Sequence, residues 1–178
     1  MSRQVKIFSG RNFQYLSRDI AREYGIELSA INTQQFSDGE IQPEIQESVR
    51  GEYVFIIAST NAPAENLMEL LLVIDAARRA STHYITVVIP YYGYARQDKK
   101  SRGREPITAR LMADLFKTAG ADRLMAVDLH TSQIQGFFDG PVDHLFALPM
   151  LANYVGSKVD RTRLTIVSPD SGRVRVAE

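Results

Sequence analysis

Residues 87–104, VVIPYYGYARQDKKSRGR, decide the fold and indicate where a ligand binds. An apolar run ends at Pro90 and opens into a loop that is hinged by Gly93 and rich in tyrosine. The loop carries five basic side chains, and a sixth follows shortly after it: Arg96, Lys99, Lys100, Arg102, Arg104 and Arg110. If the apolar run is a parallel strand, the loop lies at the carboxyl edge of a sheet, where open α/β folds bind ligands. The pattern predicts an anionic ligand with a flat group.

A loop rich in lysine and arginine is most often solvated surface that needs no ligand. Gln97 and Asp98 favour a nucleotide site, because they add a directional amide and a carboxylate to the same turn. The interleaved tyrosines also fit a loop for single-stranded nucleic acid. The neutral overall charge and the lack of a longer basic stripe count against that alternative.

The composition fits one globular domain with its own core, since 44% of the 178 residues are hydrophobic. Twenty-one basic and 21 acidic residues give a net charge of zero, so no global field attracts nucleic acid or an anionic membrane. The chain has no cysteine, which excludes disulfides and zinc-thiolate sites. The start MSRQVKIFSG lacks the apolar segment of a signal peptide. We therefore expect a cytoplasmic protein without a membrane or nucleic-acid partner.

Strand and helix signals alternate along the chain. Strands are predicted at 5–8, 26–33, 41–45, 53–58, 84–89, 122–127 and 164–168, and the second and third of them form a hairpin around Asp38-Gly39. Helices are predicted at 13–24, 66–81 and 149–158, and another begins with Pro106 just inside its start and stops at Gly120. The alternation predicts an α/β fold with a mostly parallel, doubly wound sheet.

Three polar residues follow predicted strands at the same edge as the basic loop. Asp128 and His130 come after one strand, and Asp170 comes after the last. Imidazole and carboxylate groups, with water, can hold a divalent cation that also touches phosphate. A single histidine is more often a hydrogen-bonded structural residue, but the neighbouring basic loop favours a metal site that includes His130.

The familiar phosphate-binding motifs are missing. The sequence has neither a G-x-x-x-x-G-K-[ST] loop nor a G-x-G-x-x-G fingerprint, and no G-x-S-x-G elbow. A nucleotide would therefore be held mainly by side chains. Phe36 can stack on a base or anchor an interface or the core, and Asp38 and Glu40 can accept from a base amino group or remain on a solvated hairpin.

Several stretches occur in a familiar order along nearly the whole chain: FSDGE, ESVRG, ITVVIPYYGYARQDKK, REPITA, DLHTSQIQGFFDGPVDHL and IVSPDSG. Together they resemble the amino-terminal portion of ribose-phosphate pyrophosphokinase, also called phosphoribosyl pyrophosphate synthetase. The resemblance implies a phosphoribosyltransferase-like fold. It also implies transfer of the diphosphoryl group of ATP to ribose 5-phosphate with Mg²⁺, which gives phosphoribosyl pyrophosphate and AMP.

The resemblance also assigns roles to residues. The adenine would be reached across a subunit interface by Phe36, Asp38 and Glu40. The nucleotide would be held from the other side by Arg96, Gln97 and Asp98, with Lys99 and Lys100 near the phosphates. His130 and Asp170 would hold Mg²⁺ directly or through water, and an allosteric phosphate or ADP would bind at Ser48, Arg50, Arg102 and Asp143. Asp128 is added to the metal ligands from its position after the strand, not from the resemblance.

The family forms rings of dimers, commonly hexamers, so we expect a homo-oligomer. Residues 1–147 would be the ATP-side domain, and residues 148–178 would begin an incomplete second domain. The loop that binds ribose 5-phosphate and the later catalytic loop have no counterpart in the sequence, so we expect no catalytic residue here and no activity from this chain alone. Ser171-Gly172-Arg173 also departs from the family's usual glycine pair. A non-catalytic partner subunit of an intact synthetase is the alternative.

Overall fold

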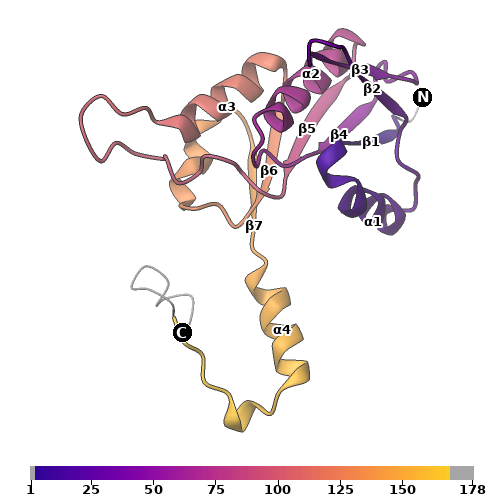
Figure 1. Cartoon of the computed structure of the whole chain (residues 1–178). Coiled ribbons are helices and arrows are strands. Elements are labelled where there is room, and N and C mark those ends of the chain that lie inside the picture. The colour runs from indigo at the N-terminus through magenta and orange to yellow at the C-terminus, as the bar shows by residue number, and fades with distance from the viewer. Residues whose placement is uncertain (1–2, 169–178) are drawn as a thin grey trace. The chain divides into compact units, whose positions relative to one another are not determined.

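Five strands form one parallel sheet in the computed structural model (Figure 1). The structure describes residues 3–168, with only the backbone described at Arg161. The order of the strands across the sheet is β1 (Val5–Ser9), β4 (Tyr53–Ile57), β5 (Tyr84–Ile89), β6 (Arg123–Val127) and β7 (Val142–Leu145). Every neighbouring pair is parallel, so the carboxyl ends of all five strands meet at one edge. The predicted α/β class with a mostly parallel sheet is confirmed.

Helices cover both faces of the sheet. After a 3₁₀ turn, η1 (Arg11–Phe13), helix α1 (Gln14–Tyr24) lies on one face, and α2 (Glu65–Arg79) and α3 (Thr108–Ala119) lie on the other (Figure 1). Side chains alternate between the faces of a strand. Ile57 therefore joins a small core with Ala21 of α1, whereas Ile56 joins the larger core with Leu70 of α2.

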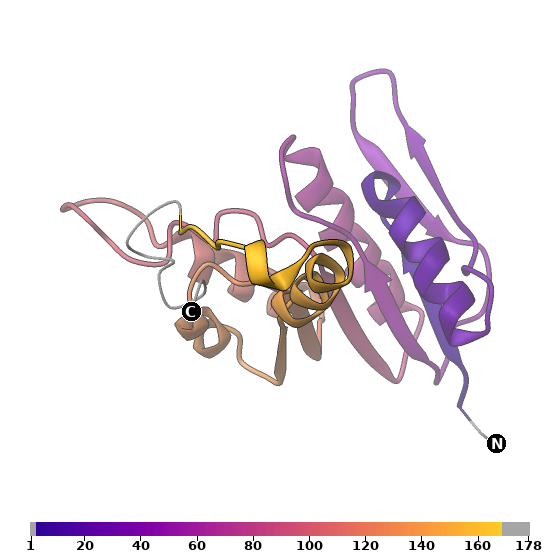
Figure 2. The ribbon, with the colours of Figure 1, turned by 90° about the horizontal axis from the view of Figure 1, so that it is seen from below.

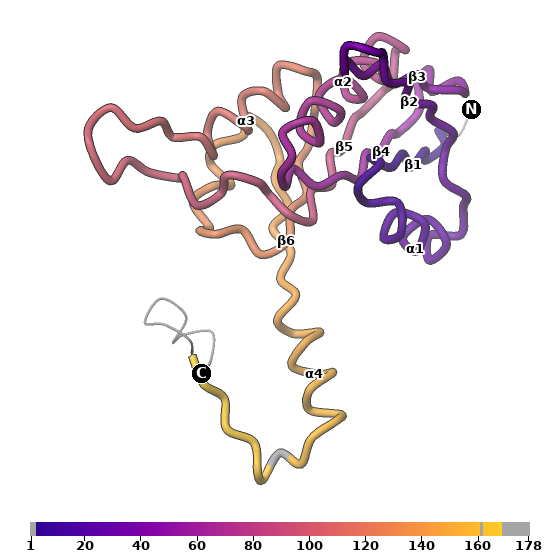
Figure 3. The backbone as a smooth tube through the Cα atoms, in the orientation of Figure 1, coloured from indigo at the N-terminus to yellow at the C-terminus, as the bar shows by residue number. Residues whose placement is uncertain are grey.

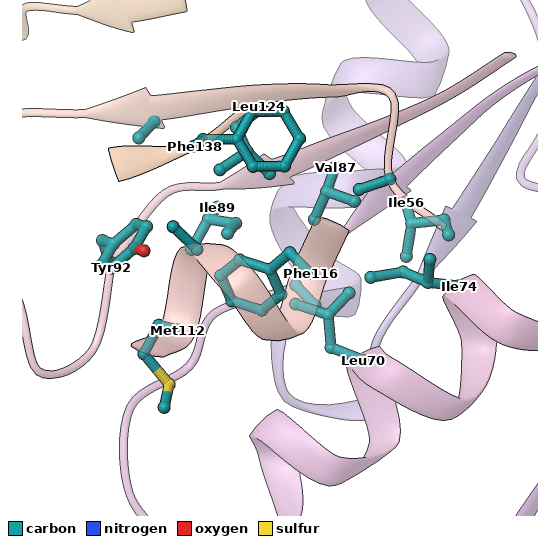
Figure 4. Packing of buried hydrophobic residues seen from close by; sticks show 14 of the residues in the cluster. Ile56, Leu70, Ile74, Val87, Ile89, Tyr92, Met112, Phe116, Leu124 and Phe138 are labelled. Carbon is teal, nitrogen blue, oxygen red and sulfur yellow. The ribbon is translucent and has the colours of Figure 1, made fainter. Parts of the chain in front are cut away.

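The larger core fixes β5 beneath α2 and α3. Val87 and Ile89 of β5 are fully buried together with Phe116 of α3 (Figure 4). The ring of Tyr92, just beyond β5, meets the Phe116 ring edge to face, with centroids 6.0 Å apart. The start of the loop after β5 is thus packed into the core.

A separate antiparallel hairpin consists of β2 (Ile31–Gln35) and β3 (Ile41–Ile45), and Ile31 and Ile45 pack against the larger core. The prediction for 41–45 is confirmed, but the strand predicted at 26–33 starts only at Ile31. The reason is that Ile26 and Leu28 pack into the small core beside α1, and the Ser29 amide donates to the Ile7 carbonyl at 2.8 Å. This stretch is fastened to β1 instead of pairing in the hairpin.

Three other predictions about elements differ from the structure. Helix α3 begins at Thr108, and Pro106 lies outside it, because the hydrogen bonds of the first turn run from the Arg110 and Leu111 amides to the Ile107 carbonyl. Strand β7 was not expected, since polar Asp143 and His144 interrupt its apolar pattern. No strand occurs at 164–168, because within the described residues this stretch pairs with no other strand.

The chain divides into two compact units, the first ending at Leu145 and the second beginning at Phe146. The second unit contains α4 (Leu148–Lys158) and a 3₁₀ turn, η3 (Arg161–Arg163). Helix α4 has no buried residue, and its Leu151 and Val155 line an apolar hollow with Leu164 and Ile166. The roles predicted for residues 1–147 and 148–178 stay predictions.

Candidate functional site

The carboxyl edge of the sheet brings together three loops of the first unit. They follow β4 at Ser59-Thr60, β5 at 90–107, and β6 at 128–131, where the last leads into a 3₁₀ helix, η2 (Ser132–Phe137). Because β4, β5 and β6 are neighbours, these loops are neighbours as well. Figure 3 traces the long loop from the end of β5 to the start of α3. We call residues 90–107 the basic loop.

The basic loop is rooted on the loop after β4. The Gly93 amide donates to Thr60 Oγ1 at 2.7 Å, and the Tyr91 amide donates to Ser59 Oγ at 3.2 Å. The approach is so close that a Cβ on Gly93 would lie 2.1 Å from the Thr60 carbonyl oxygen. Only glycine fits there without a backbone shift.

Tyr92 ties the same root to α3. Its buried hydroxyl donates to the Ala109 carbonyl at 3.0 Å. Burial, and secondarily the Asp114 carboxylate, raise the pKa of Tyr92 well above the ordinary range of tyrosine. Tyr92 therefore acts as a neutral hydrogen-bond donor.

The middle of the basic loop contacts both α3 and the loop after β6. The Gln97 carbonyl accepts from the Ala109 amide at 3.1 Å, and its side-chain oxygen accepts from the Thr108 hydroxyl. Asp98 is buried and accepts from the Thr131 hydroxyl at 2.6 Å. These contacts fix the backbone on either side of Gln97.

The cations of the basic loop face solvent. Arg96, Lys99, Lys100, Arg102 and Arg104 are all exposed. Within residues 3–168, none of the five forms an ion pair with a carboxylate. Glu105 in the same loop instead accepts from the amides of Ser101 and Arg102, at 2.8 and 2.9 Å. The loop presents positive charge that the described protein groups leave uncompensated.

Two of the three predicted metal ligands lie beside the root of the basic loop. Asp128 and His130 are exposed at the end of β6, and the Asp128 amide donates to the Leu145 carbonyl at 2.9 Å. The third residue, Asp170, lies outside the described residues. In the described part of the chain, no three acidic or histidine side chains gather as a metal site. A carboxylate and an imidazole that face solvent suit a hard divalent cation that retains water ligands.

Phe36, Asp38 and Glu40 lie at the tip of the β2–β3 hairpin, away from the basic loop. All three are exposed, and Phe36 is 47% exposed. The Phe36 amide donates to the Glu40 carbonyl at 2.8 Å, and Gly39 has φ 94°, so the turn is closed by its own backbone. Figures 1 and 2 place the hairpin and the basic loop in different parts of the first unit. One chain does not bring these two sets of residues together.

The predicted allosteric residues are also separated within one chain. Ser48 and Arg50 are exposed in the turn before β4, at the amino edge of the sheet, whereas Arg102 lies in the basic loop. Asp143 accepts two hydrogen bonds from Arg123, at 2.6 and 2.9 Å. The hydrogen bonds from Arg123 hold the pKa of Asp143 below its ordinary value. An allosteric site made of these residues stays a prediction and would need more than one chain.

The sequence reasoning missed three polar partners near the site, of which Thr60 and Glu69 are buried and Thr131 is partly buried. Thr60 holds Gly93, Thr131 holds Asp98, and Glu69 on α2 accepts from Arg11 at 3.1 Å and from Thr33 in β2 at 3.4 Å. A threonine directly after a strand that ends at a candidate site is a weak signal for Thr60 and Thr131. For Glu69, the signal is an acid within the apolar stripe of a helix.

Comparison with known proteins gives consistent matches. The model of the N-terminal domain of ribose phosphate pyrophosphokinase matches residues 5–120. A ribose-phosphate pyrophosphokinase of Streptomyces coelicolor is 60% identical over 99% of this chain and 55% of its own length, and that of Corynebacterium efficiens is 52% identical over 99% and 54%. The chain thus spans about half the length of the curated relatives it matches.

A solved structure agrees with these relatives. The crystal structure of phosphoribosylpyrophosphate synthetase from Mycobacterium smegmatis superposes with a TM-score of 0.93 at 52% identity, covering 98% of this chain and 59% of that one. Separately, no helix in the described part of the chain is long and apolar enough to cross a membrane. The cytoplasmic location expected from the sequence stays a prediction.

Proposed function

This chain belongs to the ribose-phosphate pyrophosphokinase family, as its amino-terminal portion, and from that premise we propose that it binds ATP and Mg²⁺ for ribose-phosphate diphosphokinase activity. Members of the family are transferases of nucleotide biosynthesis. The reaction would move the diphosphoryl group of ATP to ribose 5-phosphate. Transfer itself would require segments that the relatives have outside the matched half.

The observation that carries the proposal is the uncompensated charge of the basic loop. Five cations project from a loop whose root is held by buried hydrogen bonds, and no described carboxylate pairs with them. Several exposed cations in one loop bind a multiply charged anion, such as a polyphosphate, more strongly than a singly charged one. In this proposal Arg96 and Gln97 hold the nucleotide, and Lys99 and Lys100 contact its phosphates.

Mg²⁺ would be held by Asp128 and His130, together with Asp170 outside the described residues. When bound, Mg²⁺ would draw charge from the β-phosphate of ATP. The side chains of this chain would orient that phosphate. Arg96 lies two residues before the buried Asp98, and Asp98 accepts a hydrogen bond from Thr131, which directly follows His130. Arg96, Gln97, Asp128 and His130, to which this proposal assigns the nucleotide and the metal, all lie at the carboxyl edge of the sheet.

The hairpin supports the proposal that the nucleotide site is shared between chains. Phe36, Asp38 and Glu40 are exposed at the tip of the β2–β3 hairpin, and this hairpin lies apart from the basic loop of the same chain (Figure 2). A homo-oligomer, a hexamer as expected from the resemblance, would allow the hairpin of one subunit to reach the nucleotide on another. The allosteric phosphate or ADP would likewise bind between subunits.

Isothermal titration of Mg·ATP into the chain, with light scattering for mass, tests the proposal. We expect saturable binding by an oligomer that weakens at least tenfold in Arg96→Ala and in His130→Ala, because each removes a charged or metal-holding group. Arg22→Ala is the matched control, since Arg22 is an exposed arginine on α1 whose ion pair among residues 3–168 is the local one with Asp19. Absence of binding in a folded oligomer would refute the proposal and favour a non-catalytic partner subunit.

A further inference from the structure

Asp98 is the one residue between Arg96 and Arg104 that is buried, with 6% of its surface exposed. Its neighbours in the basic loop include five exposed cations, yet none of them lies within ion-pair distance of any described carboxylate, Asp98 included. The acid therefore does not neutralise the charge around it. Its carboxylate is buried and bonded to Thr131, whereas the five cations are exposed.

The partners of Asp98 are neutral donors on the loop after β6 and on η2. Thr131 Oγ1 donates to Asp98 Oδ2 at 2.6 Å, and Gln133 Nε2 lies 3.5 Å from the same oxygen. A length of 2.6 Å is typical of a hydroxyl bonded to a carboxylate, which is among the stronger hydrogen bonds in proteins. Thr131 directly follows His130, so this bond joins the basic loop to the predicted metal ligand.

The opposite side of the same turn is bonded to α3. The Gln97 carbonyl accepts from the Ala109 amide at 3.1 Å, and the Gln97 amide donates to the Tyr94 carbonyl at 2.9 Å. Gln97 and Asp98 are therefore held from two directions, by α3 and by the loop after β6. Arg96, which precedes them, is placed by this arrangement although its own side chain is exposed.

A direct contact between Asp98 and ATP is disfavoured by the same observations. A carboxylate facing a polyphosphate would repel it, and exposing Asp98 would break its bond to Thr131. Because the hydrogen-bond donors to Asp98 are neutral, all five cations remain available to bind an anion.

We infer that Asp98 is a positioning residue that acts through the Thr131 hydroxyl, coupling the nucleotide-holding Arg96 and Gln97 to the metal-holding His130. The inference rests on the proposed function, because it assigns those two roles. It predicts that loss of the Thr131 hydroxyl reduces the gain in ATP affinity caused by Mg²⁺ while the melting temperature changes little.

The test compares Thr131→Val, which keeps the branched shape but removes the hydroxyl, with Thr131→Ser, which keeps the hydroxyl. Ser132→Ala is the control, because it removes a neighbouring exposed hydroxyl with no such bond. Amide hydrogen exchange of residues 96–104 and 128–133 is measured without nucleotide, and the ATP dissociation constant is measured with and without Mg²⁺.

We expect exchange in both segments to rise about tenfold in Thr131→Val, as loss of a charge-assisted hydrogen bond implies. The affinity gained on adding Mg²⁺ should fall by a similar factor, while the melting temperature stays close to that of the wild type. Thr131→Ser should restore both readouts, and Ser132→Ala should change neither.

Two results would overturn the inference in distinguishable ways. If the wild-type chain binds Mg·ATP but Thr131→Val matches it in exchange and in the Mg²⁺ effect, or if Thr131→Ser fails to rescue, the coupling role is wrong and the proposed function stands. If the wild-type chain does not bind Mg·ATP, the proposed function fails and the coupling role fails with it.

Discussion

The basic loop and the β2–β3 hairpin are both predicted to contact the nucleotide, yet the fold supports them differently. The basic loop is held at its root by Gly93 against Thr60 and by the buried Tyr92 hydroxyl, and in its middle by the bond between Asp98 and Thr131. The hairpin tip is held by its own turn, and only the strand bases pack on the core. Changes at the root should therefore alter stability, whereas changes at the hairpin tip should alter binding alone.

The largest expected effect is on the root of the basic loop. In Gly93→Ala the new Cβ would lie 2.1 Å from backbone oxygen, so the loop after β4 or the basic loop must move. We expect the free energy of unfolding, measured in urea, to fall by about 2 to 3 kcal/mol. Gly103→Ala is the matched control, because its Cβ would meet nothing within 4 Å, and it should change stability by less than about 0.5 kcal/mol. Equal losses in both variants would contradict the close packing.

A smaller effect is expected from the Tyr92 hydroxyl. Tyr92→Phe removes the buried hydroxyl that donates to the Ala109 carbonyl and should cost about 1 to 2 kcal/mol at pH 8, whereas exposed Tyr94→Phe should cost almost nothing. Because burial raises the pKa of Tyr92, the unfolded state ionises first as pH rises above about 10, and the stabilisation is lost there. Urea unfolding should show the difference between wild type and Tyr92→Phe shrinking from pH 8 to pH 10.5. A constant difference would mean that Tyr92 is not buried in its neutral form.

The smallest effect on stability, with a selective effect on binding, is expected at the hairpin tip. Phe36→Ala should change the free energy of unfolding by less than about 0.5 kcal/mol, since the ring is half exposed. It should weaken Mg·ATP binding by the assembled protein about tenfold, as loss of a base-stacking ring implies. Gln34→Ala, an exposed change on β2, should affect neither quantity. Unchanged affinity in an oligomer of Phe36→Ala would remove the hairpin from the nucleotide site.

Much of the fold could be predicted because its signals are local. Strand β5 was predicted with its observed bounds from one apolar run, and the hairpin turn from Asp38-Gly39. The predictions that failed depended on distant partners. The residues Ile26 and Leu28 have strand-like alternation but pack beside α1, and the stretch 164–168 has no partner strand among the described residues.

The sequence by itself determined the alternation of strands and helices, the position of the basic loop after a buried strand, and the kinds of group gathered there. Only the tertiary structure decided that Asp98 bonds to Thr131, 33 residues later, that Asp143 is held by Arg123, and that Ser48 and Arg50 lie at the opposite edge from Arg102. The physical reason is that propensity and periodicity act over a few neighbouring residues. The partner of a buried polar group is instead fixed by which strands lie side by side, here β5 beside β6 and β6 beside β7.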